Sequence, residues 1–183
     1  MPPLVILDRD GVINHERADF VKSPAEWQPL AGSLDAIARL TRAGFQIAVA
    51  TNQSGVARGY YNLATLELIH AKMRQMIEIA GGHIDALFYC PHHEADACTC
   101  RKPRTGMLEA IAQHFDISLV GVPAVGDRLR DLTAYASMGC QPILVLTGHG
   151  KTTLLAAQHS PLPSNTWICE DLTAVAERLL EHK

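Results

Sequence analysis

Short apolar runs alternate with amphipathic segments along this chain, and that alternation limits the possible folds more than any other feature. Six runs have the length and composition of buried strands: residues 4–7, 45–50, 84–89, 123–126, 143–146 and 167–169. Helix-type segments lie between them, at residues 33–43, 62–80, 106–115, 129–138, 151–158 and 172–181. Strands that alternate with helices predict an α/β fold, in which a central parallel sheet is covered by helices on both faces.

Two of the helical segments carry further signals. Five apolar residues recur at spacings of three and four within residues 62–80, which predicts one buried helix face: Leu66, Ile69, Met73, Met76 and Ala80. Ser33 is suited to cap the helix over residues 33–43, and Gly44 is suited to end it. No repeat and no linker divides the chain, so we expect residues 1–183 to form one domain.

Composition excludes several classes of function. The formal net charge of the 183 residues is −3, which provides no general attraction to nucleic acid or to an anionic membrane. No apolar run approaches the roughly 20 residues that span a bilayer. The N-terminus lacks the basic region and long apolar run of a secretory signal, so we expect a cytoplasmic protein.

Polar residues follow four of the predicted strands, directly at the end of three of them and after a loop in the case of residues 84–89. These groups are Asp8 and Asp10, Thr51 to Ser54, Arg101 with Lys102, and Asp127 with Asp131. Any one group could be a turn or a helix cap. Ligands of open α/β sheets bind beyond the carboxyl ends of the strands, so four such groups together predict an active site there.

The residue types indicate phosphoryl transfer. Asp8 and Asp10 are two positions apart, so both can face one pocket, and Asp127 can complete an oxygen site for Mg²⁺. An aspartate neutralised by the metal can attack phosphorus, and the second aspartate can protonate the leaving oxygen and then activate water. Thr51 and Lys102 supply donors for the charged phosphoryl oxygens.

A separate cluster of cysteine and histidine predicts a second metal. Cys90-x-His92 and Cys98-x-Cys100 offer three thiolates and one imidazole, a donor set that suits tetrahedral Zn²⁺ in a structural role. His93 is the alternative nitrogen ligand, and a loop of free thiols is the alternative to a metal site. The five cysteines are an odd number, which argues against a disulfide framework. The two outside the cluster, Cys140 and Cys169, are expected in the core together with Trp27.

The ordered motifs resemble the haloacid dehalogenase (HAD) superfamily of phosphatases. Longer strings resemble its branch of histidinol-phosphate and heptose-bisphosphate phosphatases: Asp8-Arg-Asp-Gly-Val-Ile-Asn14, Thr51-Asn-Gln-Ser-Gly-Val-Ala-Arg-Gly59, Cys90-Pro-His-His93, Cys100-Arg-Lys-Pro103 and Gly126-Asp-Arg-Leu129. The resemblance implies a Rossmann-like three-layer sandwich with no large cap domain and with a zinc-bound loop. It also implies that residues 12–31 form a short flap over the pocket.

The resemblance assigns roles residue by residue. It implies that Asp8 is the nucleophile and Asp10 the acid/base, and that Thr51 and Lys102 hold the phosphoryl group. Mg²⁺ would take the Asp8 and Asp127 carboxylates and the Asp10 carbonyl. Substrate contacts are implied for the pocket loop, which is Asn52, Gln53 and Ser54, and for Arg101 and Arg128. They are also implied for four flap residues: Glu16, Arg17, Ala18 and Asp19. His149 could reach the rim of the pocket.

Several functions fit this residue set. The first is a sugar-phosphate phosphatase that removes the 7-phosphate of a heptose 1,7-bisphosphate for lipopolysaccharide core synthesis. The alternatives are a histidinol-phosphate phosphatase, a DNA 3′-phosphatase-like enzyme and a zinc-stabilised binding module without activity. Two rim arginines favour a substrate with an additional anion. The expected partner is therefore a small phosphorylated molecule, and a compact chain without a cap suggests a monomer.

Overall fold

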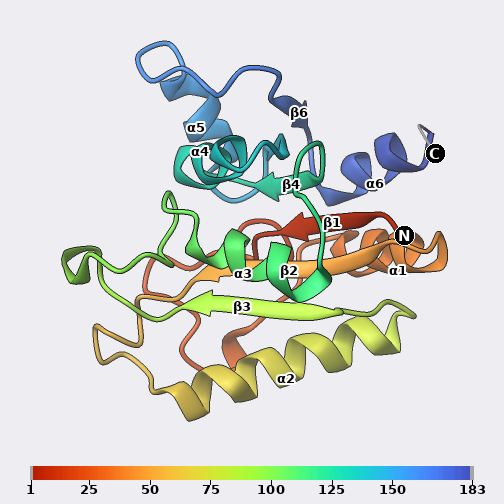
Figure 1. Cartoon of the computed structure of the whole chain (residues 1–183). Coiled ribbons are helices and arrows are strands. Elements are labelled where there is room, and N and C mark those ends of the chain that lie inside the picture. The colour runs from red at the N-terminus through yellow and green to blue at the C-terminus, as the bar shows by residue number, and fades with distance from the viewer. Residues whose placement is uncertain (1, 182–183) are drawn as a thin grey trace.

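The computed structural model describes residues 2–181 and contains one six-stranded parallel sheet. The strands are β1 (Leu4–Leu7), β2 (Gln46–Asn52), β3 (Ala86–Cys90), β4 (Pro123–Gly126), β5 (Gln141–Val145) and β6 (Trp167–Cys169). Their order across the sheet is β3-β2-β1-β4-β5-β6. The arrows of β1, β3 and β4 in Figure 1 point the same way, as a parallel sheet requires.

Helices cover both faces of the sheet and complete a three-layer α/β fold (Figure 1). One core cluster packs α1 (Ser33–Arg42), α2 (Leu63–Ile79) and α6 (Leu172–Glu181) on one face. The other cluster packs α3 (Gly106–Phe115) and α4 (Leu129–Ser137) on the opposite face, and Leu154 of α5 (Gly150–Ala156) packs against it. Two 3₁₀ turns, η1 (Pro24–Glu26) and η2 (Glu94–Asp96), lie in loops. The predicted fold class is confirmed.

The structure corrects two local predictions. β2 extends two residues beyond the predicted end because Thr51 and Asn52 still pair with Tyr89 and Cys90 of β3. Gly32 is the N-cap of α1, and Ser33 lies inside the helix with its hydroxyl donating to the Ile13 and Leu30 carbonyl oxygens. The prediction that Ser33 caps the helix is therefore wrong.

The buried face of α2 also differs slightly from its predicted stripe. Leu66, Ile69 and Met73 are fully buried, but Ile77 takes the next buried position. Met76 and Ala80 are only partly buried. The sequence spacing therefore predicted the buried face of α2 correctly in its first turns, but in the last turn the predicted residues lie at the edge of that face.

Two long connections leave the carboxyl ends of the strands. The flap, residues 12–31, follows β1, and the loop of residues 91–105 follows β3. Neither is large enough to be an inserted cap domain, as predicted. Within residues 2–181, no helix has both the length and the apolar character to cross a membrane.

The chain changes direction across the sheet between β1 and β4, and this is where the site forms. β1 and β4 pair through Leu7 and Val125, and the Asp8 amide donates to the Val125 carbonyl oxygen at 2.9 Å. The chain after β1 leads to α1 on one face of the sheet, whereas the chain after β4 leads to α4 on the opposite face. Such a crevice at the carboxyl ends of the strands is the expected ligand site of an open α/β sheet.

Trp27 anchors the flap to the sheet. It is 1% exposed and packs in the same core cluster as Val12, Ile13 and Val21 of the flap and Ile37 of α1. The Ile13 carbonyl oxygen also accepts from the Leu30 amide, which closes the base of the flap. The flap therefore sits on the hydrophobic core and is not a free loop.

We expect Trp27→Ala to lower the free energy of unfolding by about 3–5 kcal/mol, because it leaves a large cavity beneath the flap. Denaturant titration measures this loss. Leu68→Ala is the matched control: Leu68 is 60% exposed, and its removal should change the unfolding free energy by less than about 0.5 kcal/mol. Equal losses for the two variants would contradict the anchoring role.

Candidate active site

A cavity of about 320 Å³ opens at the carboxyl ends of β1, β2 and β4. It is lined by residues of six segments, and most of the predicted site residues are among them: Asp8, Asp10, Glu16, Arg17, Ala18, Thr51, Asn52, Gln53, Ser54, Arg101, Asp127 and Arg128. Asp19 is not part of the lining, because it points outward and pairs with Lys22 and Arg17. Lys102 lies behind the lining, against Asp8.

Three buried carboxylates meet at the floor of the cavity. Asp8, Asp127 and Asp131 each offer an oxygen within 4.8 Å of the others. The Lys102 ammonium lies 2.9 Å from Asp131 Oδ1 and 3.2 Å from Asp8 Oδ1, and it is 1% exposed. Burial alone would lower the pKa of Lys102, but the charges of Asp131 and Asp8 outweigh burial and raise it. Lys102 is therefore a fixed cation under this cluster.

The remaining negative charge fits a divalent cation. Burial raises the pKa of Asp8 to about 6 against the opposing charge of Lys102, and burial with the neighbouring carboxylates raises the pKa of Asp127 to about 8. Asp127 Oδ1 is buried and has no hydrogen-bond partner within residues 2–181. Hard carboxylate oxygens that repel one another are the donors Mg²⁺ prefers. The site could thus hold this metal.

Two glycines make room for the Asp127 carboxylate. A Cβ atom on Gly11 or on Gly148 would lie 2.3 Å from Asp127 Oδ2, and both residues have positive φ. The same oxygen accepts from the His149 amide at 2.7 Å. The loops after β1 and β5 therefore hold Asp127 in place by backbone contact, which requires residues without side chains.

Asp10 is held in a different environment from Asp8. The Arg9 guanidinium binds both Asp10 oxygens at 2.9 Å, and Asn14 Nδ2 and Gln53 Nε2 donate to them at 2.9 and 2.8 Å. Burial alone would raise the pKa of Asp10, but the Arg9 charge and these hydrogen bonds outweigh it and lower the pKa. The two aspartates therefore face one cavity in different electrostatic environments, Asp8 among carboxylates and Asp10 beside a guanidinium.

Donors for a phosphate group come from β2 and the loop after β3. Thr51 is 1% exposed, and its hydroxyl accepts from Gln53 Nε2 at 2.9 Å. Asn52 clasps the Lys102 backbone, accepting from its amide and donating to its carbonyl oxygen, both at 3.1 Å. Lys102 Nζ in turn donates to the Ala50 carbonyl oxygen. These contacts fix the end of β2 to Lys102.

Each of the two predicted rim arginines is paired with a carboxylate. Arg128 contacts Glu16 of the flap, and Glu16 also contacts His149, so three segments meet at the cavity mouth. Arg101 lies 3.1 Å from Glu94, which is mostly exposed. Arg58 and Arg130 also line the cavity. The rim therefore carries several arginines, and an anionic ligand could take the place of the Glu16 and Glu94 carboxylates on two of them.

The Cys/His cluster has the predicted membership. Cys90, His92, Cys98 and Cys100 lie together, with sulfur–sulfur distances of 3.1–3.6 Å and the His92 Nδ1–Cys100 Sγ distance at 3.3 Å. Zn–S bonds of 2.3 Å would set sulfur atoms about 3.8 Å apart at a tetrahedral ion, so the cluster could hold zinc with a small expansion. His93 is outside the cluster, since its Nδ1 accepts from the Ala95 amide.

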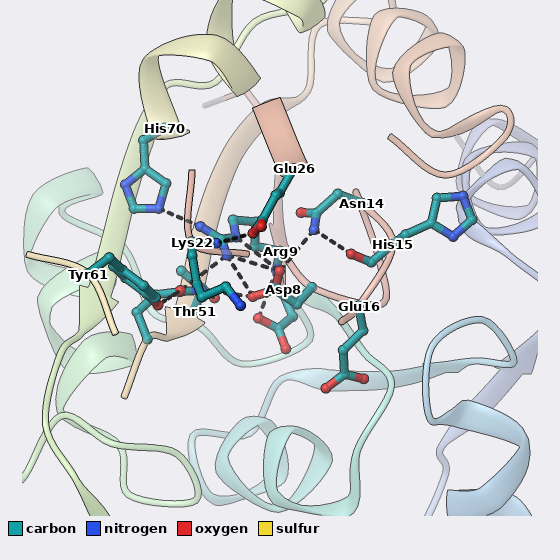
Figure 2. A network of polar contacts seen from close by, with 12 residues as sticks. Asp8, Arg9, Asn14, His15, Glu16, Lys22, Glu26, Thr51, Tyr61 and His70 are labelled. Atoms are coloured by element: carbon teal, nitrogen blue, oxygen red, sulfur yellow. Dashed lines mark hydrogen bonds and ion pairs between the residues drawn. The ribbon is translucent and has the colours of Figure 1, made fainter. Parts of the chain in front are cut away.

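Sequence reasoning missed the residues that support Asp10. Arg9 lies within the Asp8–Asp10 motif but received no role, and it is 1% exposed. His70 was not among the predicted site residues either, although it is also 1% exposed and contacts Arg9 (Figure 2). Tyr61 donates to Gln53 Oε1 at 2.8 Å. The burial stripe of α2 could have flagged His70, because it lies next to Ile69 and one turn before Met73.

Comparison with known protein families identifies the superfamily. Residues 4–126 match the polynucleotide kinase 3 phosphatase family, and residues 99–175 match a HAD-hydrolase-like family. The chain is 56% identical over 178 residues to the D-glycero-beta-D-manno-heptose-1,7-bisphosphate 7-phosphatase of Bordetella bronchiseptica, covering 97% of this chain and 98% of that protein. It is 51% identical to the enzyme of the same name from Pseudomonas aeruginosa, with the same coverage.

Solved structures agree with the sequence relatives. The heptose 1,7-bisphosphate phosphatase of B. bronchiseptica, complexed with magnesium and phosphate, superposes with a TM-score of 0.95 over 99% of both chains. The corresponding phosphatase of Burkholderia thailandensis, 45% identical, gives 0.77 over 97% of this chain and 98% of that one. The chain therefore belongs to the heptose-1,7-bisphosphate 7-phosphatase family within the HAD superfamily.

Proposed function

We propose that this chain is a Mg²⁺-dependent phosphatase that removes the 7-phosphate of D-glycero-D-manno-heptose 1,7-bisphosphate, in lipopolysaccharide core synthesis. The observation that carries the proposal is the pair Asp8 and Asp10, which face one cavity in opposite electrostatic environments. The names of relatives at 48–56% identity supply the substrate. We further propose one domain over residues 1–183, a monomer, a cytoplasmic location, and no nucleic-acid or membrane partner.

Asp8 and Asp10 divide the chemistry. An Asp8 oxygen attacks the phosphorus atom, the bond from phosphorus to the sugar oxygen breaks, and protonated Asp10 gives its proton to that oxygen. Ionised Asp10 then takes a proton from water as the water oxygen attacks the aspartyl phosphate, which releases inorganic phosphate and the Asp8 carboxylate. The lowered pKa of Asp10 suits the second step, and the negative charge of a bound phosphate raises it for the first.

The remaining residues bind and orient. Mg²⁺, held by the Asp8 and Asp127 carboxylates and the Asp10 carbonyl oxygen, would neutralise charge between the nucleophile and the phosphate. Thr51 and Lys102 would bind the phosphoryl oxygens. Substrate contacts are proposed for the pocket loop, the rim and the flap: Asn52, Gln53, Ser54, Arg101, Arg128, Glu16, Arg17 and Ala18. Asp19, the ninth contact that the sequence predicted, is left out of that set because it lies outside the cavity lining.

Zinc is proposed as a structural ion of the loop after β3. Cys90, His92, Cys98 and Cys100 would fill all four positions of a tetrahedral ion, which leaves none for substrate. Cys100 directly precedes Arg101 and Lys102. An ion at the cluster would therefore hold the backbone that presents one rim arginine and the buried lysine.

Two other substrates have some support. The match of residues 4–126 to the polynucleotide kinase 3 phosphatase family favours a DNA 3′-phosphate. The net charge of −3 disfavours it, because DNA binding relies on a basic surface. Histidinol phosphate would use the same catalytic set. It carries cationic groups, however, and the cavity rim carries Arg58, Arg101, Arg128 and Arg130, which suits a second phosphate better.

We expect phosphate release from heptose 1,7-bisphosphate with a kcat/KM at least about 100-fold above that for histidinol phosphate, roughly 2.7 kcal/mol of discrimination. A side-by-side assay with Mg²⁺ measures this ratio, and a 3′-phosphorylated oligonucleotide tests the third substrate. Asp8→Asn is the blank and should be inactive. The reverse ranking would reassign the substrate, and activity that persists in Asp8→Asn would refute the aspartyl-phosphate mechanism.

Stability should depend on pH through the carboxylate cluster. The pKa of Asp127 rises from 3.8 to about 8 on folding, so the folded metal-free chain retains a proton that the unfolded chain releases. The contribution of Asp127 to stability is complete below about pH 3.8 and is lost as the pH rises through about 8. Mg²⁺ replaces that proton, so added Mg²⁺ should raise the Tm more at pH 8 than at pH 6.

Thermal unfolding with and without Mg²⁺ at both pH values checks this expectation. Asp127→Asn removes the titrating group, and the Mg²⁺-induced rise in Tm should become small and independent of pH. An equal rise at pH 6 and pH 8 in the unsubstituted protein would show that Asp127 does not exchange a proton for the metal.

Zinc removal should raise KM about tenfold, or 1.4 kcal/mol, while the far-UV circular dichroism of the sheet is retained, because only the loop bearing Arg101 and Lys102 loosens. His92→Ala should reproduce the effect. His93→Ala is the matched control, since His93 is adjacent but outside the cluster. Unchanged kinetics in a sample verified as zinc-free would refute this role.

A further inference from the structure

A buried histidine contacts the active site from behind and has no part in the proposed chemistry. His70 lies on α2, is 1% exposed and packs its ring 5.6 Å from the ring of Tyr89. Its Nε2 is 3.2 Å from Nη1 of Arg9. In Figure 2, His70 lies on the far side of Arg9 from Asp8, and the dashed line joins it to Arg9.

The Arg9 guanidinium contacts the active site through one of its terminal nitrogens and His70 through the other. Its Nη2 donates to both Asp10 oxygens and to Gln53 Oε1, and its Nε lies 3.3 Å from Asp10 Oδ1. Within residues 2–181, Nη1 hydrogen bonds only to His70 Nε2. Arg9 is 1% exposed, so removal of the His70 acceptor would leave a buried N–H donor unpaired, which is costly. The hydrogen bond to His70 therefore fixes the outer end of the guanidinium plane.

The environment of His70 selects one form of its ring. Nε2 must carry a lone pair to accept from Arg9, so the ring is neutral with its proton on Nδ1. Nδ1 is buried and has no hydrogen-bond partner within residues 2–181. Burial first, and the Arg9 charge second, lower the pKa of His70 to about 3, in agreement with a neutral ring. His70 thus serves Arg9 as an acceptor only.

We propose that His70 is a positioning residue for Asp10, acting through Arg9. The guanidinium clamp can hold the Asp10 carboxylate in one orientation only if its own plane is fixed, and the His70 acceptor fixes it. Without that acceptor, Arg9 would rotate toward another oxygen and carry Asp10 with it. Because this inference rests on the proposed role of Asp10 in proton transfer, it affects turnover more than binding.

A second contact supports the clamp from the other side. Tyr61 donates to Gln53 Oε1 at 2.8 Å, and Gln53 Nε2 donates to Asp10 Oδ2 at 2.8 Å. Gln53 Oε1 also accepts from Arg9 Nη2 at 3.1 Å, a contact that does not need the Tyr61 hydroxyl. Tyr61→Phe should therefore lower kcat less than His70→Leu does. A larger loss of kcat in Tyr61→Phe would contradict the proposal that His70 is the main support of Arg9.

The test compares two substitutions at one position. His70→Leu fills similar space without an acceptor, and His70→Gln offers a carbonyl oxygen near the place of Nε2. Steady-state kinetics on heptose 1,7-bisphosphate with saturating Mg²⁺ should show kcat lower by about tenfold or more in His70→Leu, equal to 1.4 kcal/mol, with KM within about twofold. His70→Gln should recover most of the loss.

Met73→Ala is the control for a loosened helix. Met73 is fully buried one turn further along α2 and packs in the apolar core. It should lower the Tm at least as much as His70→Leu while leaving kcat close to that of the unsubstituted protein. If His70→Leu does not fold, His70→Met replaces it, because a thioether is only a weak acceptor.

Each failure has a distinct meaning. A kcat within twofold in His70→Leu would overturn the proposal and leave His70 as a packing residue. Equal losses in His70→Leu and His70→Gln, or an equal loss in Met73→Ala, would also overturn it, because the acceptor would then not be the cause. No turnover by the unsubstituted protein would instead refute the proposed function itself.

Discussion

The junction between β1 and β4 is the constraint on which the rest of the site depends. Pairing of Leu7 with Val125 brings the ends of two strands together that are far apart in the sequence, and it leaves Asp8 beside Asp127 in a buried crevice. Carboxylates in such a place repel one another and are poorly solvated, so each must be neutralised by a partner. Lys102 supplies one positive charge, and the raised pKa of Asp127 marks the charge that still lacks a partner.

The two catalytic aspartates differ because different elements surround them. Asp8 faces the acidic cluster and Lys102, whereas Asp10 is held by Asn14 and Gln53 and by the guanidinium of Arg9, the single residue between the two aspartates. The clamp around Asp10 extends back to His70 on α2, so the orientation of one carboxylate depends on a helix of the outer layer.

The rim is built from loops that the core holds at their bases. Trp27 seats the flap on one core cluster, and the Cys/His cluster gathers the loop after β3. Glu16 on the flap pairs with Arg128, and Glu94 on the loop pairs with Arg101. Glu94 is exposed and the Glu16–Arg128 pair is partly exposed, so these pairs contribute little to stability and an incoming anion can displace the carboxylates. The rim therefore allows a ligand to replace its carboxylates, whereas the buried carboxylates and Lys102 at the floor are held in fixed positions.

The sequence by itself determined the α/β class, five of the six helices nearly to the residue, the order of the catalytic motifs and the three cysteines of the Cys/His cluster, whereas the structure selected His92 over His93. These depend on periodicity and on spacing within short segments, which local chemistry controls. Only the tertiary structure decided that Asp131 joins Asp8 and Asp127, that Asp19 points away from the cavity, and that His70 contacts Arg9. Such contacts join residues up to 123 positions apart, and strand order and helix packing decide them, not any local preference.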